Sequence, residues 1–369
     1  MNELQNTISN DTERLVNRED AARIINALYA IADKDGKRFV KPTLSQKTIP
    51  YDGEQHSVIE IFDNYDSDSM LLTGDVIATE QGVYTVFVQL KRYQDVWLDN
   101  SSDVLSFSWM IGSNGELSWS NASDDNIVSL INASDAGRID LVEDCGWEVG
   151  DIREVQLSAM EATGVSESHV AQTVQLALVA KDTGVQDVSN PCYNYQYVTP
   201  IEGGRTYPKF IVQQVEGLKE SGYMNSSSSN AGSWNGCLRR TWCNTVYKDA
   251  MPSTLINAFK QAKVKTIATY NGDSIQESDD YFFLPAEVEI FSSLSYSNAA
   301  ESTTLAQWPY YVDSTKIIKK SGSAGSAVYW WERSPDASYY TRFCAVGSNA
   351  AKNAGNASNK YLLAPAGCI

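Results

Sequence analysis

The sequence predicts an α+β fold built from three successive parts. Apolar residues near the N-terminus recur at three- and four-residue steps, which is typical of an amphipathic helix. Residues 39–113 are rich in β-branched and aromatic segments separated by turn residues, which favours a β-sandwich. The remaining chain places two helical patterns among short strands and long loops. We therefore expect a helix within 1–38, a sandwich over 39–113 and an α+β domain over 114–369.

Composition limits the classes of partner. The chain has 369 residues, nine Trp and a hydrophobic share of 43%, which is enough for real cores. Its net charge of −17 argues against nucleic acid as a partner, because phosphates require Lys and Arg, and also disfavours anionic lipid. We expect no membrane insertion, since no apolar run approaches the ~20 residues that span a bilayer. The N-terminus has no secretory signal, so work outside a cell would require another route, such as release within a virus particle.

The first element is a helix over residues 11–35. Asn17 followed by Asp20 is suited to capping its main part, and Gly36 stands where a helix ends. A lone helix cannot bury its apolar stripe, so it either packs on the next domain or joins copies or a partner for attachment. The stripe consists of Ala21, Ile24, Ile25, Leu28, Ile31 and Ala32.

The second part contains the strand patterns HSVIEIF, GVYTVFVQL and VLSFSWMI. Turn residues such as Tyr51-Asp52-Gly53 separate them at intervals typical of a sandwich. This arrangement resembles immunoglobulin-like modules, which implies a spacer or a weak adhesion unit. The aspartates at 63, 66 and 68 lack the spacing and distal Glu of a calcium loop, so we interpret them as a turn.

In the third part, polar residues 114–126 mark a boundary, after which local patterns predict each element. The segment 181–208, with its Pro, Gly and Asn, is expected to be a long loop. The predicted elements are a helix from Asp125 to Gly137, two strands of one sheet in GWEVGDIREVQLSAM and HVAQTVQLALVAK, a helix from Asn235 to Met251, another helix opened by Pro252, and a strand and helical turn in YFFLPAEVEIF.

The tail from Val328 to Ile369 is the most informative stretch. It opens with Tyr329, Trp330 and Trp331, which predict a buried strand, and it closes on an apolar segment. Between them lie small, polar and aromatic residues, the composition that antigen-binding loops use. We expect a surface segment pinned at both ends, with its other side chains facing solvent.

Several runs carry a family resemblance in this order: DAGRIDLVEDCGWEVGDIREVQLSAM, GYMNSSSSNAGSWNGCLRRTWCNTVYKDAMPSTL, SGSAGSAVYWWERSP, and RSP-x-AS-x4-FC-x-V followed by AP-x2-CI. They resemble the C-type-lectin-fold domains of gut-phage and bacterial variable proteins diversified by retroelements. The resemblance covers roughly residues 122–369. It implies that the C-terminal domain has a C-type lectin fold, like that of formylglycine-generating enzymes, with a variable region at about 333–369.

In such systems adenine-directed mutagenesis rewrites Asn codons, which implies a set of varied, ligand-binding positions. Lys352 and Lys360 do not fit this substitution pattern. The varied positions are Asp336, Tyr339, Tyr340, Thr341, Arg342, Ala345, Gly347, Asn349, Ala351, Asn353, Gly355, Asn356, Ser358, Asn359 and Tyr361. The expected fixed scaffold is Arg333, Ser334, Pro335, Phe343, Cys344, Val346, Ala364, Pro365, Cys368 and Ile369.

No pattern of catalytic or metal-binding residues emerges. The two His, His56 and His169, fall in different predicted domains, which argues against a His metal pair. The six Cys show no CxxC spacing; they are either buried thiols or disulfides such as Cys344–Cys368 or Cys237–Cys243. We expect no enzyme activity, no metal and no cofactor.

The resemblance implies a non-enzymatic, hypervariable receptor-binding protein on a phage virion. Its expected partners are a protein or glycan of the bacterial cell surface, other virion proteins through the N-terminal region, and further copies of the chain. Tyr339, Tyr340, Arg342 and Tyr361 are the expected anchors, since aromatic residues and Arg dominate binding energies. Two alternatives are a bacterial surface adhesin and a structural virion protein whose tail packs against neighbouring subunits.

Overall fold

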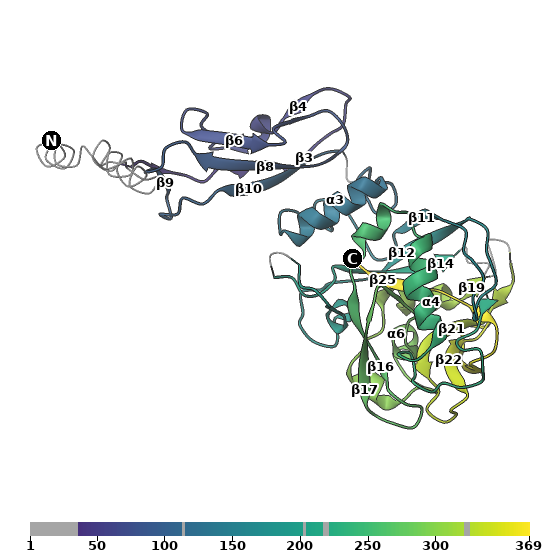
Figure 1. Cartoon of the computed structure of the whole chain (residues 1–369). Helices are drawn as coiled ribbons and strands as arrows, with labels where there is room; N and C mark the ends of the chain where they lie inside the picture. The colour runs from purple at the N-terminus through teal and green to yellow at the C-terminus, as the bar shows by residue number, and fades with distance from the viewer. Residues whose placement is uncertain (1–35, 113–114, 202–203, 217–220, 321–324) are drawn as a thin grey trace, which may run out of the picture. The chain divides into compact units, whose positions relative to one another are not determined.

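The structure is a computed structural model that describes residues 36–112, 115–201, 204–216, 221–320 and 325–369. The helix predicted over 11–35 lies outside these residues. The protein is mixed α and β, with more residues in strands than in helices. It divides into two compact units (Figure 1). The first comprises residues 36–47, 53–79 and 84–109, and the second comprises 48–52, 80–83 and the described residues from 110 onward.

The first unit consists of strands, most of which are short. The long strand β8 pairs in antiparallel fashion with β6 and also neighbours β10, while β1 and β9, β2 and β5, and β4 and β7 form two-stranded pairs. The strands are β1 (Arg38–Phe39), β2 (Thr43–Leu44), β4 (His56–Ser57), β5 (Phe62–Asp63), β6 (Met70–Gly74), β7 (Ile77–Ala78), β8 (Gly82–Leu90), β9 (Val96–Trp97) and β10 (Leu105–Ile111), with a 3-10 turn at Val58–Ile61.

Buried and exposed side chains alternate along part of β8, and the buried ones contribute to the core of this unit. Val86 and Val88 are buried while Phe87 between them is exposed, as expected for a strand with one covered face. Met70 and Trp97 complete the cluster around Val88. Two of the three predicted strand patterns, GVYTVFVQL and VLSFSWMI, form the strands β8 and β10. The prediction of a strand is wrong for most of HSVIEIF, because Val58–Ile61 forms a 3-10 turn that buries Val58 and Ile61.

The second unit is organised by three sheets. The first has five strands in the order β11-β12-β14-β25-β18, the second has three in the order β13-β16-β17, and the third has five in the order β15-β24-β21-β22-β23. The strands are β3 (Thr48–Ile49), β11 (Ile152–Leu157), β12 (Gln172–Lys181), β13 (Gln196–Tyr197), β14 (Phe210–Glu216), β15 (Ser221–Gly222), β16 (Ala262–Ile267), β17 (Ile275–Asp280), β18 (Phe282–Phe283), β19 (Lys319–Lys320), β20 (Ala327–Val328), β21 (Trp330–Pro335), β22 (Arg342–Val346), β23 (Lys352–Asn356), β24 (Tyr361–Leu362) and β25 (Ala366–Cys368).

Helices are few and short in this unit. The helix α3 begins after Ser123, whose hydroxyl accepts a hydrogen bond from the Asn126 amide at 3.2 Å and so satisfies an end donor. The helices are α3 (Asp124–Asp135), α4 (Leu238–Trp242), α5 (Lys248–Ala250) and α6 (Glu287–Phe291); a π turn at Cys243–Tyr247 joins α4 to α5, and 3-10 turns cover Pro191–Asn194, Leu255–Ala258, Ala299–Thr303, Pro309–Val312 and Ser314–Ile317.

Most local predictions are confirmed. The predicted helix at 125–137 is α3, the two strands predicted for one sheet are the antiparallel pair β11 and β12, and the helix predicted from Asn235 runs from α4 through α5. The helix predicted after Pro252 is wrong in extent. Only one 3-10 turn forms there, since Phe259 turns to an extended conformation and the chain enters β16.

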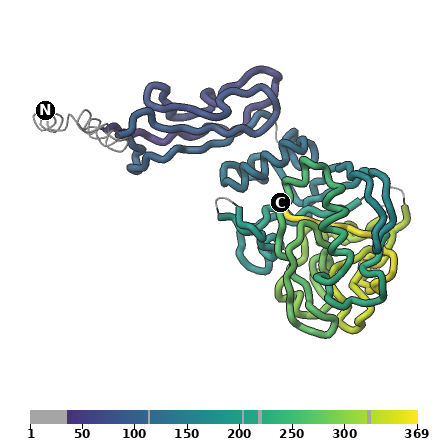
Figure 2. Tube along the Cα trace, viewed as in Figure 1, coloured from purple at the N-terminus to yellow at the C-terminus, as the bar shows by residue number. Residues whose placement is uncertain are grey.

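The C-terminal tail is part of the body of the second unit. Its last strand, β25, lies between β14 and β18 in the first of the three sheets. Figure 2 shows this yellow end of the chain running among the teal and green segments. The strands β21, β22 and β23 form consecutive antiparallel neighbours in the third sheet. The tail is therefore held by two sheets, and this determines which of its side chains reach solvent.

Candidate ligand-binding face

The scaffold positions of the tail are buried, as predicted. Arg333, Phe343, Cys344 and Val346 have no exposed surface, and the other six scaffold positions are also buried. Trp330 and Trp331 are buried at the start of β21, whereas Tyr329 is 38% exposed and stacks on Tyr361. The expectation of a segment pinned by buried anchors is confirmed.

Eleven of the fifteen positions expected to vary are exposed or half-buried. Tyr339 and Tyr340 are 53% and 62% exposed and stand at the tip of the loop between β21 and β22. The other exposed positions are Asn349, Ala351 and Asn356, and the half-buried ones are Thr341, Arg342, Asn353, Ser358, Asn359 and Tyr361.

The expectation that all of these side chains face solvent is wrong for Asp336, Ala345, Gly347 and Gly355, which are buried. Ala345 lies on β22 between β21 and β23, where it is covered on both sides of the sheet. A Cβ on Gly355 would approach the Tyr361 ring to 2.5 Å, so a larger residue requires that ring to move. Asp336 is 1% exposed, and one of its carboxylate oxygens accepts the Ser338 amide at 2.8 Å.

The loop from Ser338 to Arg342 is an ordered aromatic and cationic tip. The Arg342 guanidinium lies 4.3 Å from the centre of the Tyr339 ring, in cation–π contact. Among the described residues it forms no ion pair with a carboxylate. Tyr340 makes an edge contact with Tyr270, with ring centres 6.2 Å apart. The Arg342 guanidinium and the neighbouring Tyr339 and Tyr340 rings are suited to contact a ligand through stacking and hydrogen bonds.

Asn230 fixes the backbone of this loop through hydrogen bonds. Its side-chain amide donates to the carbonyls of Tyr339 at 3.0 Å and Arg342 at 2.8 Å, while its own backbone amide donates to the Tyr340 carbonyl at 2.7 Å. Asn230 is only 1% exposed. The exposed tyrosines are therefore presented on a backbone fixed by a buried polar residue more than a hundred positions away in the sequence.

Replacing Asn230 by Ala should make the loop from Ser338 to Arg342 more mobile without unfolding the second unit. Two carbonyls lose their donors, which we expect to lower the free energy of unfolding by about 1–2 kcal/mol. Hydrogen exchange of the amides at 339–342 should become faster, measured by mass spectrometry. Asn349→Ala, at an exposed position, is the matched control and should change stability by less than about 0.5 kcal/mol. Unchanged exchange at 339–342 in the Asn230 variant would contradict this role.

The structure adds three loops to the face that sequence reasoning did not assign to it. They span residues 225–233, 268–272 and 292–298, which read NSSSSNAGS, ATYNG and SSLSYSN. Ser228 and Ser358 share a hydrogen bond of 2.6 Å, the Ala337 amide donates to the Tyr296 carbonyl at 2.7 Å, and Tyr270 contacts Tyr340. Their Ser, Asn, Tyr and Gly content matches that of the tail, and this was the sequence signal that could have identified them.

The two lysines that do not fit the substitution pattern connect the tail to its surroundings. Lys352 donates to the Ser293 hydroxyl at 2.7 Å, within one of the added loops. Lys360 forms an ion pair with Glu167, and the pairing lowers the pKa of that carboxyl. Both positions lie at the surface beside varied positions.

Buried charges support the face from within. Arg333 donates to Glu289 at 2.6 Å and to the Leu284 and Lys265 carbonyls at 2.8 and 3.1 Å. Glu287 accepts backbone amides from residues 295–297, which fixes one of the added loops. This network ties β21, the strand that leads into the Tyr339 loop, to α6 and the loop that follows it.

Glu332 differs from these carboxylates, because neither of its oxygens has a hydrogen-bond partner among the described residues and its side chain has no exposed surface. Burial raises its pKa well above the usual value, and the charges of Glu287 and Glu301 raise it further. A carboxyl whose pKa is raised in the folded state favours folding at low pH. That contribution is lost as pH rises from about 4.5, its ordinary value, through the raised pKa.

Glu332→Gln should therefore gain stability relative to the wild type as pH rises. Gln cannot ionise, so the difference in melting temperature between variant and wild type should grow from about pH 4.5 to pH 8. Differential scanning calorimetry across that range measures it. Glu154→Gln, which removes an exposed carboxyl from β11, is the matched control. If the difference in melting temperature for Glu332→Gln did not change with pH, the assignment of a buried carboxyl with a raised pKa would be contradicted.

The two histidines considered for chemistry, His56 and His169, belong to different units of the structure. Met160 and His169 exchange backbone hydrogen bonds of 2.8 Å, and burial lowers the pKa of the His169 imidazole. All six cysteines are buried and none is in a disulfide, so neither the Cys344–Cys368 nor the Cys237–Cys243 bond forms in this structure. In the described part of the chain, no group of three His, Cys, Asp or Glu is placed to hold a metal ion. No helix among these residues has the length and apolarity that crossing a membrane requires.

Comparison with known proteins gives one match. Residues 208–369 match the model of a family described as a domain of unknown function (DUF6273). That range contains the whole tail, Asn230 and the three added loops. No curated protein and no solved structure matches the chain. The candidate face thus lies entirely within the segment that is similar to this family.

Proposed function

We propose that this protein is a non-enzymatic ligand-binding protein whose C-terminal domain, of C-type lectin type, presents the face described above. The observation that carries the proposal is the separation within one tail between buried anchors and exposed Tyr, Asn and Ser residues. Solvent-facing substitutions usually change stability by less than about 0.5 kcal/mol, so such a face tolerates changes of identity. The three added loops support the proposal because they extend the face with residues of the same kind.

The setting that the resemblance implies is a phage virion that contacts a protein or glycan of the bacterial cell surface. In this proposal the first unit is an immunoglobulin-like spacer, and the N-terminal region attaches to other virion proteins. The bacterial surface adhesin is the alternative setting for the same binding face. Ordered backbone under adaptable side chains favours recognition in either case, since a pre-organised surface loses less entropy on binding.

The test is simultaneous replacement of Tyr339, Tyr340 and Arg342 by Ala. The labelled full chain is first screened on a panel of intact bacterial strains and on arrayed bacterial glycans, and the triple variant is then compared on every target bound. With hot-spot residues worth about 2 kcal/mol each, we expect at least a ~100-fold loss of affinity. The melting temperature should stay within a few degrees, because these side chains are exposed or half-buried.

Tyr93→Ala is the matched control, since Tyr93 is a tyrosine of the first unit that is 86% exposed. It should leave binding unchanged. If the triple variant keeps full affinity for every target, the face is not the binding site. If the triple variant keeps its fold but loses its assembly with neighbouring subunits, the structural virion alternative is supported instead.

A further inference from the structure

The candidate face differs in charge from the chain as a whole. The sequence has 46 Asp and Glu against 29 Lys and Arg. Residues 336–361, in contrast, contain three cations and a single acid, which is the buried Asp336. The three added loops at 225–233, 268–272 and 292–298 contain no charged residue. The face is therefore a cationic area on an acidic protein, and its cations are Arg342, Lys352 and Lys360.

Arg342 is the cation of this face that has no partner of opposite charge. Lys360 forms an ion pair with Glu167, and Lys352 donates to the Ser293 hydroxyl at 2.7 Å. The Arg342 guanidinium lies 4.3 Å from the centre of the Tyr339 ring, and it forms no ion pair or side-chain hydrogen bond with any residue that the structure describes. Because a guanidinium carries five N–H donors, this side chain keeps them for a ligand.

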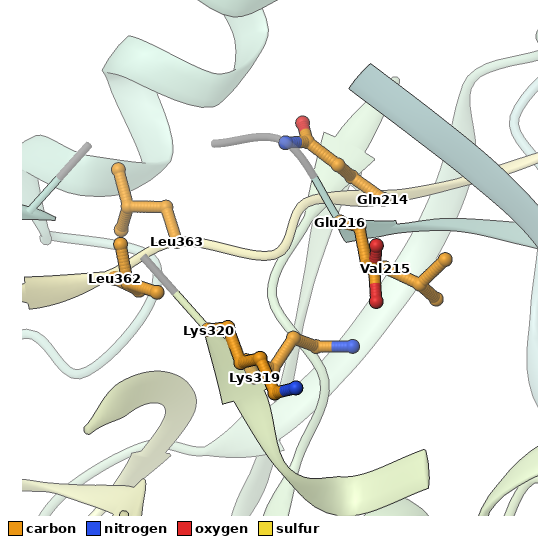
Figure 3. A pocket seen from close by; sticks show the side chains of 7 residues that line it. All are labelled: Gln214, Val215, Glu216, Lys319, Lys320, Leu362 and Leu363. Atoms are coloured by element: carbon orange, nitrogen blue, oxygen red, sulfur yellow. The ribbon is translucent and has the colours of Figure 1, made fainter. Parts of the chain in front are cut away.

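Most other arginines of the second unit are used differently. Four of them are paired with carboxylates, in the pairs Arg153–Asp124, Arg205–Asp135, Arg240–Asp280 and Arg333–Glu289. Lys319 and Lys320, which lie outside the face, line a small pocket that Glu216 also lines (Figure 3). An acid thus accompanies each of these cations, whereas Arg342 is half-buried at the surface without one among the described residues.

The position of Arg342 is fixed before a ligand binds. Its carbonyl accepts the Asn230 side-chain amide at 2.8 Å, and its guanidinium lies against Tyr339. On the sheet it stands directly opposite Asn356 of β23, which is exposed, and opposed residues of paired strands share one face. A guanidinium fork matches the two oxygens of a carboxylate or phosphate, and a fork that is already held in place loses little freedom on binding.

The surrounding side chains suit a sugar better than a protein surface. Across the three added loops and residues 336–361, the exposed large apolar side chains are the rings of Tyr339 and Tyr340. Ser and Asn recur among the remaining residues, and Ser is depleted in protein–protein interfaces. Hydroxyl and amide groups can pair with the hydroxyls of a sugar, while an aromatic ring packs on its apolar C–H face.

We propose that the ligand of this face is an acidic glycan, an inference that rests on the function proposed above. A carboxylate or phosphate group of the glycan accepts two hydrogen bonds from the Arg342 guanidinium. The Tyr340 ring, 62% exposed, packs against a neighbouring sugar, and Asn356 contacts the sugar beside the anionic group. The absence of acidic residues from the tail beyond the buried Asp336 keeps repulsion of such a ligand low.

The test uses the full wild-type chain and polysaccharide extracted from each bacterial strain that binds it in the screen described above. Each extract is immobilised in three forms: untreated, carboxyl-reduced and dephosphorylated. We expect the wild type to bind an untreated extract at least about 10-fold more tightly than one of its neutralised forms. The form that loses binding shows whether the anionic group is a uronic acid or a sugar phosphate.

Variants assign this preference to the guanidinium. Arg342→Gln should bind the untreated and neutralised forms with affinities within about 2-fold of each other, and Arg342→Lys should keep only part of the preference, because an ammonium lacks the fork. Arg38→Gln is the matched control, since Arg38 is an exposed arginine of the first unit, and it should keep the full preference. The comparison of glycan forms with the unaltered protein does not depend on the folding of a variant.

Equal affinity of the wild type for untreated and neutralised forms would overturn the acidic-glycan proposal. Loss of all cell binding after protease treatment of the bacteria would also overturn it, because the ligand would then be a protein. In both cases the proposed function still stands if the Tyr339, Tyr340 and Arg342 triple variant fails to bind. If the triple variant binds as well as the wild type, the proposed function fails and the acidic-glycan proposal fails with it.

Discussion

Replacing Arg333 by Met should lower the free energy of unfolding by about 3–5 kcal/mol, because a buried carboxylate loses its charge partner. Arg333 and Glu289 are 0% and 1% exposed at the side chain and are joined at 2.6 Å. Arg333 also donates to the carbonyls of Lys265 and Leu284, which belong to other segments of the unit. Urea unfolding followed by Trp fluorescence measures the change.

The matched control for Arg333→Met is the double variant that also carries Glu289→Gln. Removing both charges avoids an unpaired buried carboxylate, so the double variant should recover part of the lost stability. A single variant that costs less than about 1 kcal/mol would show that the pair is not needed to hold β21 in place.

Replacing Trp330 by Ala should cost about 3–5 kcal/mol, since a large side chain is removed from a packed interior. Trp330 has no exposed surface, its ring nitrogen donates to the Ile317 carbonyl at 3.0 Å, and its ring stacks with Tyr311 at 6.2 Å. Phe343→Ala, also fully buried, should fall in the same range.

Tyr93→Ala is the control for these core variants, with an expected change of less than about 0.5 kcal/mol at an exposed position. Thermal and urea unfolding of the three variants give the comparison. If Trp330→Ala changed the free energy of unfolding as little as the control does, the tail would not be anchored through β21. The distinction between buried scaffold positions and the exposed face would then be contradicted.

Local sequence patterns predicted elements with clear periodicity. The helix α3 and the strand pair β11 and β12 follow from the spacing of their apolar residues, and the buried positions of the tail follow from aromatic and apolar anchors such as Trp330 and Phe343. The helix predicted after Pro252 is shorter than expected. Pairing of the following residues in the strand β16 outweighs their local helix propensity.

The candidate face could be predicted only in part. Small residues in the tail favoured exposure, yet Ala345 and Gly355 are buried, since Ala and Gly fit a closely packed strand as well as they fit a surface. The Asn230 amide and the loop at 225–233 could not be assigned from the tail, because their contacts join residues more than a hundred positions apart. Their composition was visible in the sequence, but their location beside Tyr339 and Ser358 was not.

The sequence alone determined that this chain has acidic character, mixed α and β elements, and a C-terminal segment of buried anchors alternating with small polar and aromatic residues. The tertiary structure alone decided which of those residues reach solvent and which distant loops join them. The reason is physical: periodicity assigns a residue to one face of a strand, but exposure depends on whether another part of the chain covers that face. On β22 both faces are covered, while at Tyr339 and Tyr340 the chain leaves the sheet and more than half of each side chain stays exposed beside its contacts with Arg342 and Tyr270.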